Sequence, residues 1–111
     1  MEPGSLLLVA KHVMKLLVER RFDELEAASN GVQLSADDME DALADLGAPL
    51  AMPPDRNWAD LKVQAVRNWP GAFNVTMDIY TTRGKSDRSV ELTLHSKNGK
   101  PVIEVDDIPL R

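Results

Sequence analysis

Strict alternation of apolar and polar residues in the C-terminal third constrains this chain more than any other feature. Ala72–Tyr80 carries an apolar side chain at every second position from Phe73, and Arg88–Ser96 does so from Val90. Because successive side chains of a β-strand point to opposite faces, this period indicates strands with one buried and one solvated face. Pro101–Ile108 follows as a third strand.

The segments around these strands complete a sheet. Leu61–Ala65 also alternates and is predicted to be the first strand. Pro70-Gly71 favours a type II turn, and Asn98-Gly99 suits the positive φ angles of a two-residue hairpin. Thr81–Asp87 is polar and is expected to form a longer loop. We therefore predict a four-stranded antiparallel meander.

Two helices are predicted near the N-terminus. Ser5–Arg21 has apolar residues close to a 3.6-residue period, with Ser5 as the N-cap. Phe22–Ser29 reads as a shorter helix, which Asn30-Gly31 would end because both residues tolerate left-handed backbone.

A third helix completes the predicted α+β domain. It begins at Ser35, with Asp38 at the capping-box position, and ends at Gly47. The length of 111 residues fits a single domain over 1–111, with a helical part at 1–47, a Pro-rich connector at 48–59 and a sheet at 60–111. We expect the three helices to pack on one face of the meander.

Composition favours a cytoplasmic protein. The chain has no cysteine, so disulfides and thiolate metal sites are excluded. The longest strongly apolar run, Leu6–Ala10, is far shorter than the roughly 20 residues that span a bilayer.

Acidic residues are concentrated in the helical part. The net charge of the chain is −5, but residues 19–45 alone hold nine acids against two bases, whereas residues 57–111 hold seven acids against eight bases. Nucleic acid is an unfavourable partner for such a surface, because affinity for phosphates comes from clustered Lys and Arg. A basic protein would be attracted and steered to it.

The sequence predicts no catalytic residues, no cofactor and no metal site. His12 and His95 lie in different elements without a second ligand at metal-binding spacing, and His95 is expected to be solvated. Trp58 and Trp69 flank the first strand, where we expect them to close the edge of the core.

Asp106-Asp107 is the most suggestive acid pair. Adjacent residues of a strand point to opposite faces, so the two carboxylates address one ligand only if the strand bulges. Asp107 would otherwise point inward, and we expect it at the end of the strand, capping a turn or contacting Arg88 or Arg83.

The run Met77–Asp87, followed by Glu91–Leu94 and Glu104–Ile108, is similar to a pattern in small bacterial domains of unknown function. The shared pattern is an Asp, an aromatic residue, a polar loop ending in Ser-Asp, and a strand. Such domains resemble immunity proteins of bacterial toxin systems, including contact-dependent inhibition. The resemblance implies a small cytoplasmic protein that blocks the active site of one toxin, frequently a basic nuclease.

The leading hypothesis is therefore a non-enzymatic immunity protein that neutralises a cationic toxin domain. The acids of the third helix and the solvated face of the sheet would contact the Lys and Arg residues of the toxin. The candidate partner-binding residues are Asp37, Asp38, Asp41, Asp45, Asp78, Tyr80, Glu91, Glu104 and Asp106.

Two alternatives stay open. The first is a small enzyme or ligand-binding domain with a pocket between helices and sheet, as in nuclear-transport-factor-like folds. A deep polar pocket holding Asp78 or Asp107 would favour it. The second is a homodimer that forms through exposed strand edges.

Overall fold

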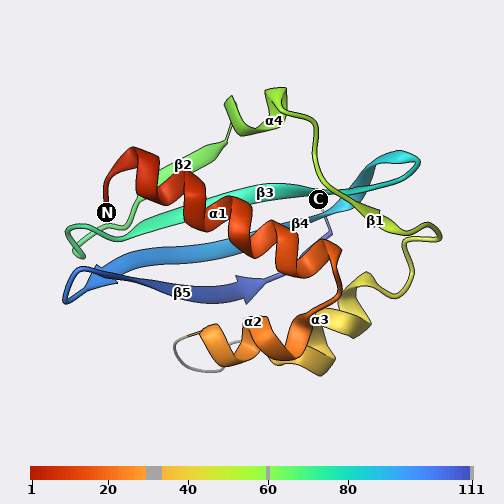
Figure 1. Cartoon of the computed structure of the whole chain (residues 1–111), viewed down its shortest axis with the longest axis horizontal. Helices are drawn as coiled ribbons and strands as arrows, with labels where there is room; N and C mark the ends of the chain where they lie inside the picture. The colour runs from red at the N-terminus through yellow and green to blue at the C-terminus, as the bar shows by residue number, and fades with distance from the viewer. Residues whose placement is uncertain (30–33, 60, 111) are drawn as a thin grey trace.

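The chain forms helices first and an antiparallel sheet second, as the computed structural model shows (Figure 1). It describes residues 1–29, 34–59 and 61–110. The predicted α+β class is confirmed. The elements are α1 (Pro3–Val18), α2 (Phe22–Ala28), α3 (Ala36–Leu43), β1 (Leu50–Ala51), α4 (Arg56–Ala59), β2 (Lys62–Ala65), β3 (Phe73–Thr81), β4 (Gly84–Lys97) and β5 (Lys100–Asp107).

The sheet has five strands rather than the predicted four. Its order is β1-β3-β4-β5, and β2 also pairs with β3. Leu50 lies opposite Thr81, and Lys62 lies opposite Thr76, so β1 and β2 both pair with β3. The predicted connector thus contains β1 and α4. A strand of two residues and a helix of four are too short to produce a detectable period.

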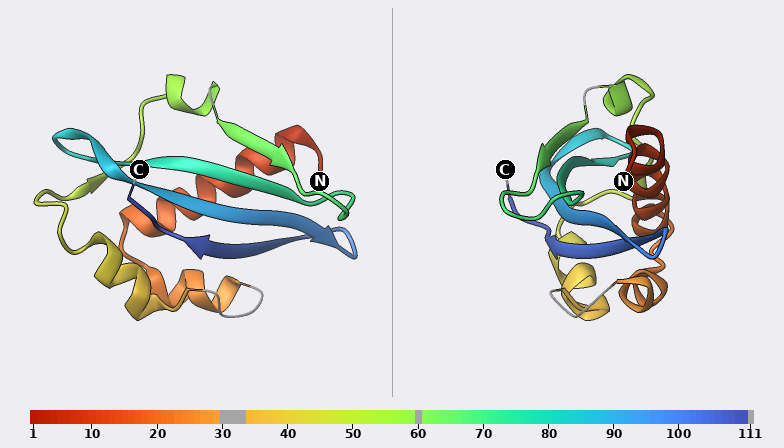
Figure 2. Two further views of the ribbon diagram at one scale, coloured as in Figure 1. Left: turned by 180° about the vertical axis from the view of Figure 1, so that it is seen from behind. Right: turned by 90° about the vertical axis from the view of Figure 1, so that its left-hand side faces the viewer.

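α1 supplies most of the helical contribution to the core. Figure 2 shows the sheet curling around this helix, which lies along its concave side. Ala10, Val13 and Met14 are fully buried, and they belong to one apolar cluster with Val75 and Leu92 of the sheet. The period of 3.6 residues in α1 and the period of two in the strands therefore meet in a single core.

α2 and α3 lie beside β5 rather than across the centre of the sheet (Figure 2). Leu25 and Met39 are fully buried and bring the two helices into the same core cluster. Ser29 forms a parallel bridge with Ile103 of β5. The helical pair thus covers an edge of the sheet that would otherwise be open to another strand.

α1 begins and ends differently from the prediction. The helix begins at Pro3 and its N-cap is Glu2, so Ser5 lies inside the helix. Proline is favoured at the first helical position because its fixed φ is already helical. At the other end, Arg20 has a φ of 58°, and its N–H bonds the carbonyl of Leu17 at 3.0 Å. Asn30-Gly31, the predicted stop of α2, lies outside the described residues.

The capping box of α3 is confirmed. The Ser35 hydroxyl accepts from the Asp38 N–H at 3.1 Å, and the Asp38 carboxylate accepts from the Ser35 N–H at 3.2 Å. The helix is shorter than predicted, because it ends at Leu43 and not at Gly47. The N–H of Ala44 bonds the carbonyl of Asp41 at 3.3 Å, so the last turn tightens before the chain leaves the helix.

Two of the predicted turns of the sheet are confirmed, and one predicted loop is wrong. Asn98 and Gly99 both have positive φ, and Gly71 has a φ of 83° in a turn closed by a bond from Ala72 to Trp69. The predicted loop Thr81–Asp87 is wrong, since β4 already begins at Gly84.

None of the described helices combines the length and hydropathy needed to cross a membrane.

Replacing Ser35 tests the start of α3. Ser35→Ala removes the acceptor for the Asp38 N–H, and we expect the free energy of unfolding to fall by about 1 kcal/mol. Ser5→Ala is the matched control, because Ser5 is exposed inside α1 and caps nothing. Urea unfolding followed by circular dichroism measures both, and equal losses would contradict the assignment of the cap.

Candidate partner-binding surfaces

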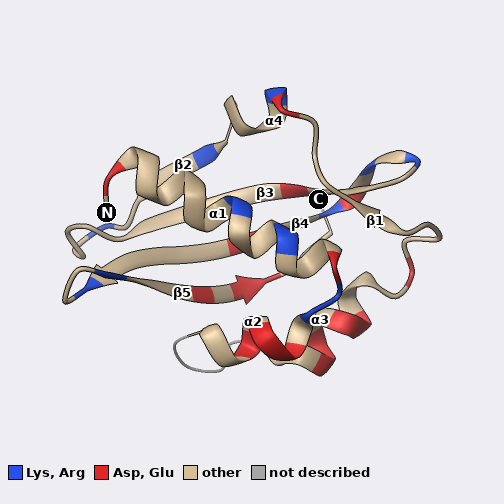
Figure 3. Cartoon of the chain, viewed as in Figure 1, with Lys and Arg blue, Asp and Glu red and all other residues tan. Residues whose placement is uncertain are grey.

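The first candidate surface lies on α2 and α3. We define the helical acidic surface as the exposed acids of these helices that take no part in the capping box of α3: Asp23, Glu24, Asp37, Glu40 and Asp41. Both helices are rich in red in Figure 3. Glu24 pairs with Arg21. Among the described residues, Asp37, Glu40 and Asp41 form no ion pair, so their charges face solvent.

A hollow separates the two helices on this surface. It has a volume of about 180 Å³, and Asp23, Asp37 and Glu40 line it together with Arg20. The hollow is held in shape by Glu26, whose carboxylate accepts from the Ala36 N–H at 2.7 Å and so joins α2 to the start of α3. Sequence reasoning missed this role of Glu26, because nothing local indicates a bond across ten residues.

Two predicted residues of the third helix contribute less than expected. Asp38 is exposed but is engaged in the capping box. Asp45 is exposed but lies beyond the end of α3, so it does not continue the helical stack of Asp38 and Asp41. Asp37 and Asp41 are the predicted residues that remain on the helical acidic surface.

The second candidate surface is the outer sheet face, the side of the sheet that points away from α1. Strand register decides which of its acids are neighbours. Thr76 lies opposite Glu91, Asp78 opposite Ser89, and Thr93 opposite Glu104. Asp78, Glu91 and Glu104 therefore each face a hydroxyl residue on a neighbouring strand, and Glu91 also lies opposite Asp107 of β5.

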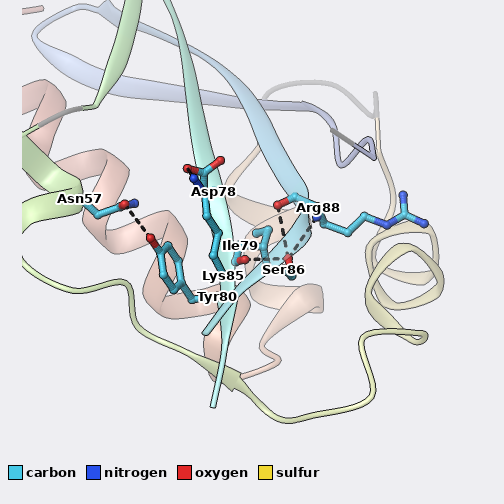
Figure 4. A network of polar contacts seen from close by, with 7 residues as sticks. All are labelled: Asn57, Asp78, Ile79, Tyr80, Lys85, Ser86 and Arg88. Atoms are coloured by element: carbon cyan, nitrogen blue, oxygen red, sulfur yellow. Dashed lines mark hydrogen bonds and ion pairs between the residues drawn. The ribbon is translucent and has the colours of Figure 1, made fainter. Parts of the chain in front are cut away.

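Asp78 and Tyr80 are held by contacts within the protein (Figure 4). The Asp78 carboxylate lies 3.2 Å from Nζ of Lys85, and the Tyr80 hydroxyl donates to Oδ1 of Asn57 at 3.0 Å. Ser86 donates to the carbonyl of Ile79 at 2.6 Å and accepts from the Arg88 N–H, where the register of β3 and β4 shifts. Ser86 thus bonds across a bulge in the β3–β4 pair, at a position where the sequence predicted a loop.

A polar cavity of about 240 Å³ lies next to Asp78, with Asn57, Lys62 and Lys85 in its wall. This volume is below the ~300–1,000 Å³ typical of small-molecule sites. The space between α1 and the sheet is instead filled by core side chains such as Val13. Among the described residues, no group of three or more His, Asp and Glu side chains could hold a metal ion.

His95 was predicted to be solvated, but the structure shows it largely buried. Its side chain is 12% exposed, and Nε2 lies 3.4 Å from the Glu104 carboxylate without a hydrogen-bond partner. The ring of Trp69 covers it at a centroid distance of 4.5 Å. Trp69 is therefore packed on the outer sheet face and not in the core, whereas Trp58 packs against the core as predicted.

Asp106 and Asp107 are separated by a bulge. Glu91 pairs with Asp107 and Leu92 with Val105, which leaves Asp106 as the extra residue of β5. Asp106 accepts from the Thr93 hydroxyl at 2.6 Å. Asp107 is exposed rather than inward, and its carboxylate caps the strand end by accepting from the Ile108 N–H at 2.8 Å.

Asp107 takes the first of its two expected roles, the cap, and Arg88 contacts a different group. The Arg88 guanidinium donates to the carbonyl of Ile108 at 2.9 Å, and Ser89 N–H donates to the carbonyl of Pro109 at 3.1 Å. The C-terminal segment is thus tied to β4.

Comparison with protein families gives a match to the domain of unknown function DUF7668 over residues 14–110. No curated protein matches the chain.

Thr93→Val tests whether the outer sheet face is internally satisfied. Thr93 is 9% exposed and its hydroxyl donates to a carboxylate, so we expect a loss of about 1.5–3 kcal/mol in the free energy of unfolding. Thr76→Val is the control on the neighbouring strand, where the threonine is half-buried. Chemical unfolding measures both, and a neutral Thr93→Val would mean that the bond to Asp106 contributes nothing.

Proposed function

We propose that this chain, which belongs to the DUF7668 family, is a non-enzymatic immunity protein that binds and neutralises a cationic toxin domain of the nuclease type in the cytoplasm. The observation that carries this proposal is the helical acidic surface, where three carboxylates from two helices line one hollow. The resemblance of Met77–Asp87 and the strands after it to immunity-type domains supports the same conclusion.

The proposed mechanism is occlusion steered by charge. A nuclease binds the phosphate backbone of its substrate through clustered Lys and Arg. The helical acidic surface would attract that cluster and accelerate encounter. Asp23, Asp37 and Glu40 line the hollow beside Arg20, and a guanidinium or ammonium group of the toxin would bind one of these carboxylates there. Substrate and immunity protein would then compete for the same basic residues.

The helical acidic surface suits this role better than the outer sheet face. On the sheet, Asp78 faces Lys85, Glu104 faces His95 and Asp106 accepts from Thr93. Using Asp78 or Asp106 for a partner would require breaking a contact that already satisfies its carboxylate. A complex formed through the helical acidic surface would break no ion pair of Asp37, Glu40 or Asp41 among the described residues. We therefore assign first contact with the toxin to α2 and α3.

The first experiment is affinity capture of the tagged chain from its native host, with bound proteins identified by mass spectrometry. The expected result is one stoichiometric basic fragment that is toxic when expressed alone and harmless when co-expressed with this chain. A captured fragment without toxicity, or no partner at all, would contradict the immunity function and favour the small-ligand alternative.

A charge-swap pair tests the assigned surface. We expect Glu40→Lys with Asp41→Lys to slow association with the captured toxin by about tenfold at low salt, and less at high salt. The control is Asp55→Lys with Asp87→Lys, which changes the net charge equally at exposed positions outside α2 and α3. Stopped-flow binding at several salt concentrations gives both rates. Equal slowing would assign the effect to total charge.

A further inference from the structure

β2 leaves one edge of the sheet open. Within the described part of the chain it pairs with β3 alone (Figure 1). Its four residues are all exposed. Val63, at the middle of the strand, is 43% exposed. The opposite edge of the sheet is covered by α2 and α3 through the bridge between Ser29 and Ile103. An open edge with an exposed apolar residue is a site for strand addition.

The direction of the β2 hydrogen-bonding groups follows from its turn. The Val66 N–H bonds the carbonyl of Ala72 at 2.9 Å, in the same register that places Gln64 opposite Asn74 and Lys62 opposite Thr76. Bonded and non-bonded pairs alternate in an antiparallel ladder. Val63, opposite Val75, therefore directs its N–H and C=O away from β3, toward the open edge.

This arrangement is self-complementary about Val63. In an antiparallel pair of two β2 strands related by a two-fold axis, Val63 would form a bonded pair with Val63 of the second copy. Leu61 would pair with Ala65 of the second copy in the same way. Lys62 would lie opposite Gln64 of the second copy, so no like charges are opposed. The register therefore satisfies the backbone without an electrostatic penalty.

An apolar groove adds contact area on the α1 side of the same edge. It has a volume of about 340 Å³, and Leu7, Trp58, Val63 and Phe73 lie in its wall. Lys11 lies over the Trp58 ring, 5.6 Å from its centroid, and helps to hold that wall in place. A ladder of five residues alone falls short of the ~1,200 Å² that specific interfaces bury, so the groove has to contribute.

We propose that two copies of this chain associate through β2, in register about Val63, to form one continuous antiparallel sheet. The proposal is independent of the immunity function. The helical acidic surface lies beside β5, at the opposite edge of the sheet from β2 (Figure 2). The dimer would therefore carry two helical acidic surfaces, both free to bind.

Single cysteines test this register, because the native chain has none. In the proposed pair the two Val63 Cα atoms are about 5.5 Å apart, within the range that a disulfide bridges. The two Ala65 Cα atoms are about 14 Å apart, beyond that range. Under mild oxidation we expect Val63→Cys to form covalent dimers at least about tenfold faster than Ala65→Cys, which lies on the same strand and face and is also exposed.

Sedimentation equilibrium tests the association itself. The wild-type chain should show a monomer–dimer equilibrium between micromolar and millimolar concentration. Val63→Pro should shift it toward monomer without unfolding, because the lost N–H points away from β3. Leu8→Thr, which removes an exposed apolar residue outside the groove, should leave it unchanged. A wild-type monomer at all concentrations, or equal cross-linking of both cysteine variants, would overturn the proposal.

Discussion

The contact between α1 and the concave side of the sheet is the interaction on which the rest of the structure depends. Ala10 and Val13 are fully buried against strands whose inward residues, such as Val75 and Leu92, are buried to the same degree. Burial of this kind contributes roughly 25 cal/mol per Å² of apolar surface. It covers the inward side chains of β3 and β4, so the surfaces left for a partner are the outer sheet face, the β2 edge with its apolar groove and the solvent sides of the helices.

The parts of the fold that sequence predicted well are those with a sustained period. α1 and the long strands repeat their patterns several times, and the Asn98-Gly99 turn has a backbone requirement that few residues meet. β1 and α4 escaped prediction because neither is long enough to show a period. The predicted start of β4 lies after the observed one. The Ser86 side chain bonds the backbone at a bulge there, and polar residues at a bulge resemble a loop in sequence.

The sequence predicted the role of a candidate residue where that role depends on neighbours in the chain, and missed it where the role depends on the folded sheet. The capping function of Asp38 depends on residues three positions apart and was visible in sequence. The neighbours of Glu104 and Asp106 depend on strand register and bulges, so alternation alone placed these acids on a face but did not reveal the His95 and Thr93 side chains that lie against them. Trp69 is the same case, since only the folded hairpin brings it over His95.

β1 has a consequence for how the chain reaches its native state. It pairs with the C-terminal end of β3, while β2 pairs with the N-terminal end, so the segment between them is pinned at both ends to one strand. Residues 50 and 81 must meet before that edge is complete, and contacts of such sequence separation slow folding. Because Val13 and Leu25 are buried in one cluster with residues of β3, β4 and β5, the apolar sides of the helices stay uncovered in a nascent chain until those strands have been synthesised.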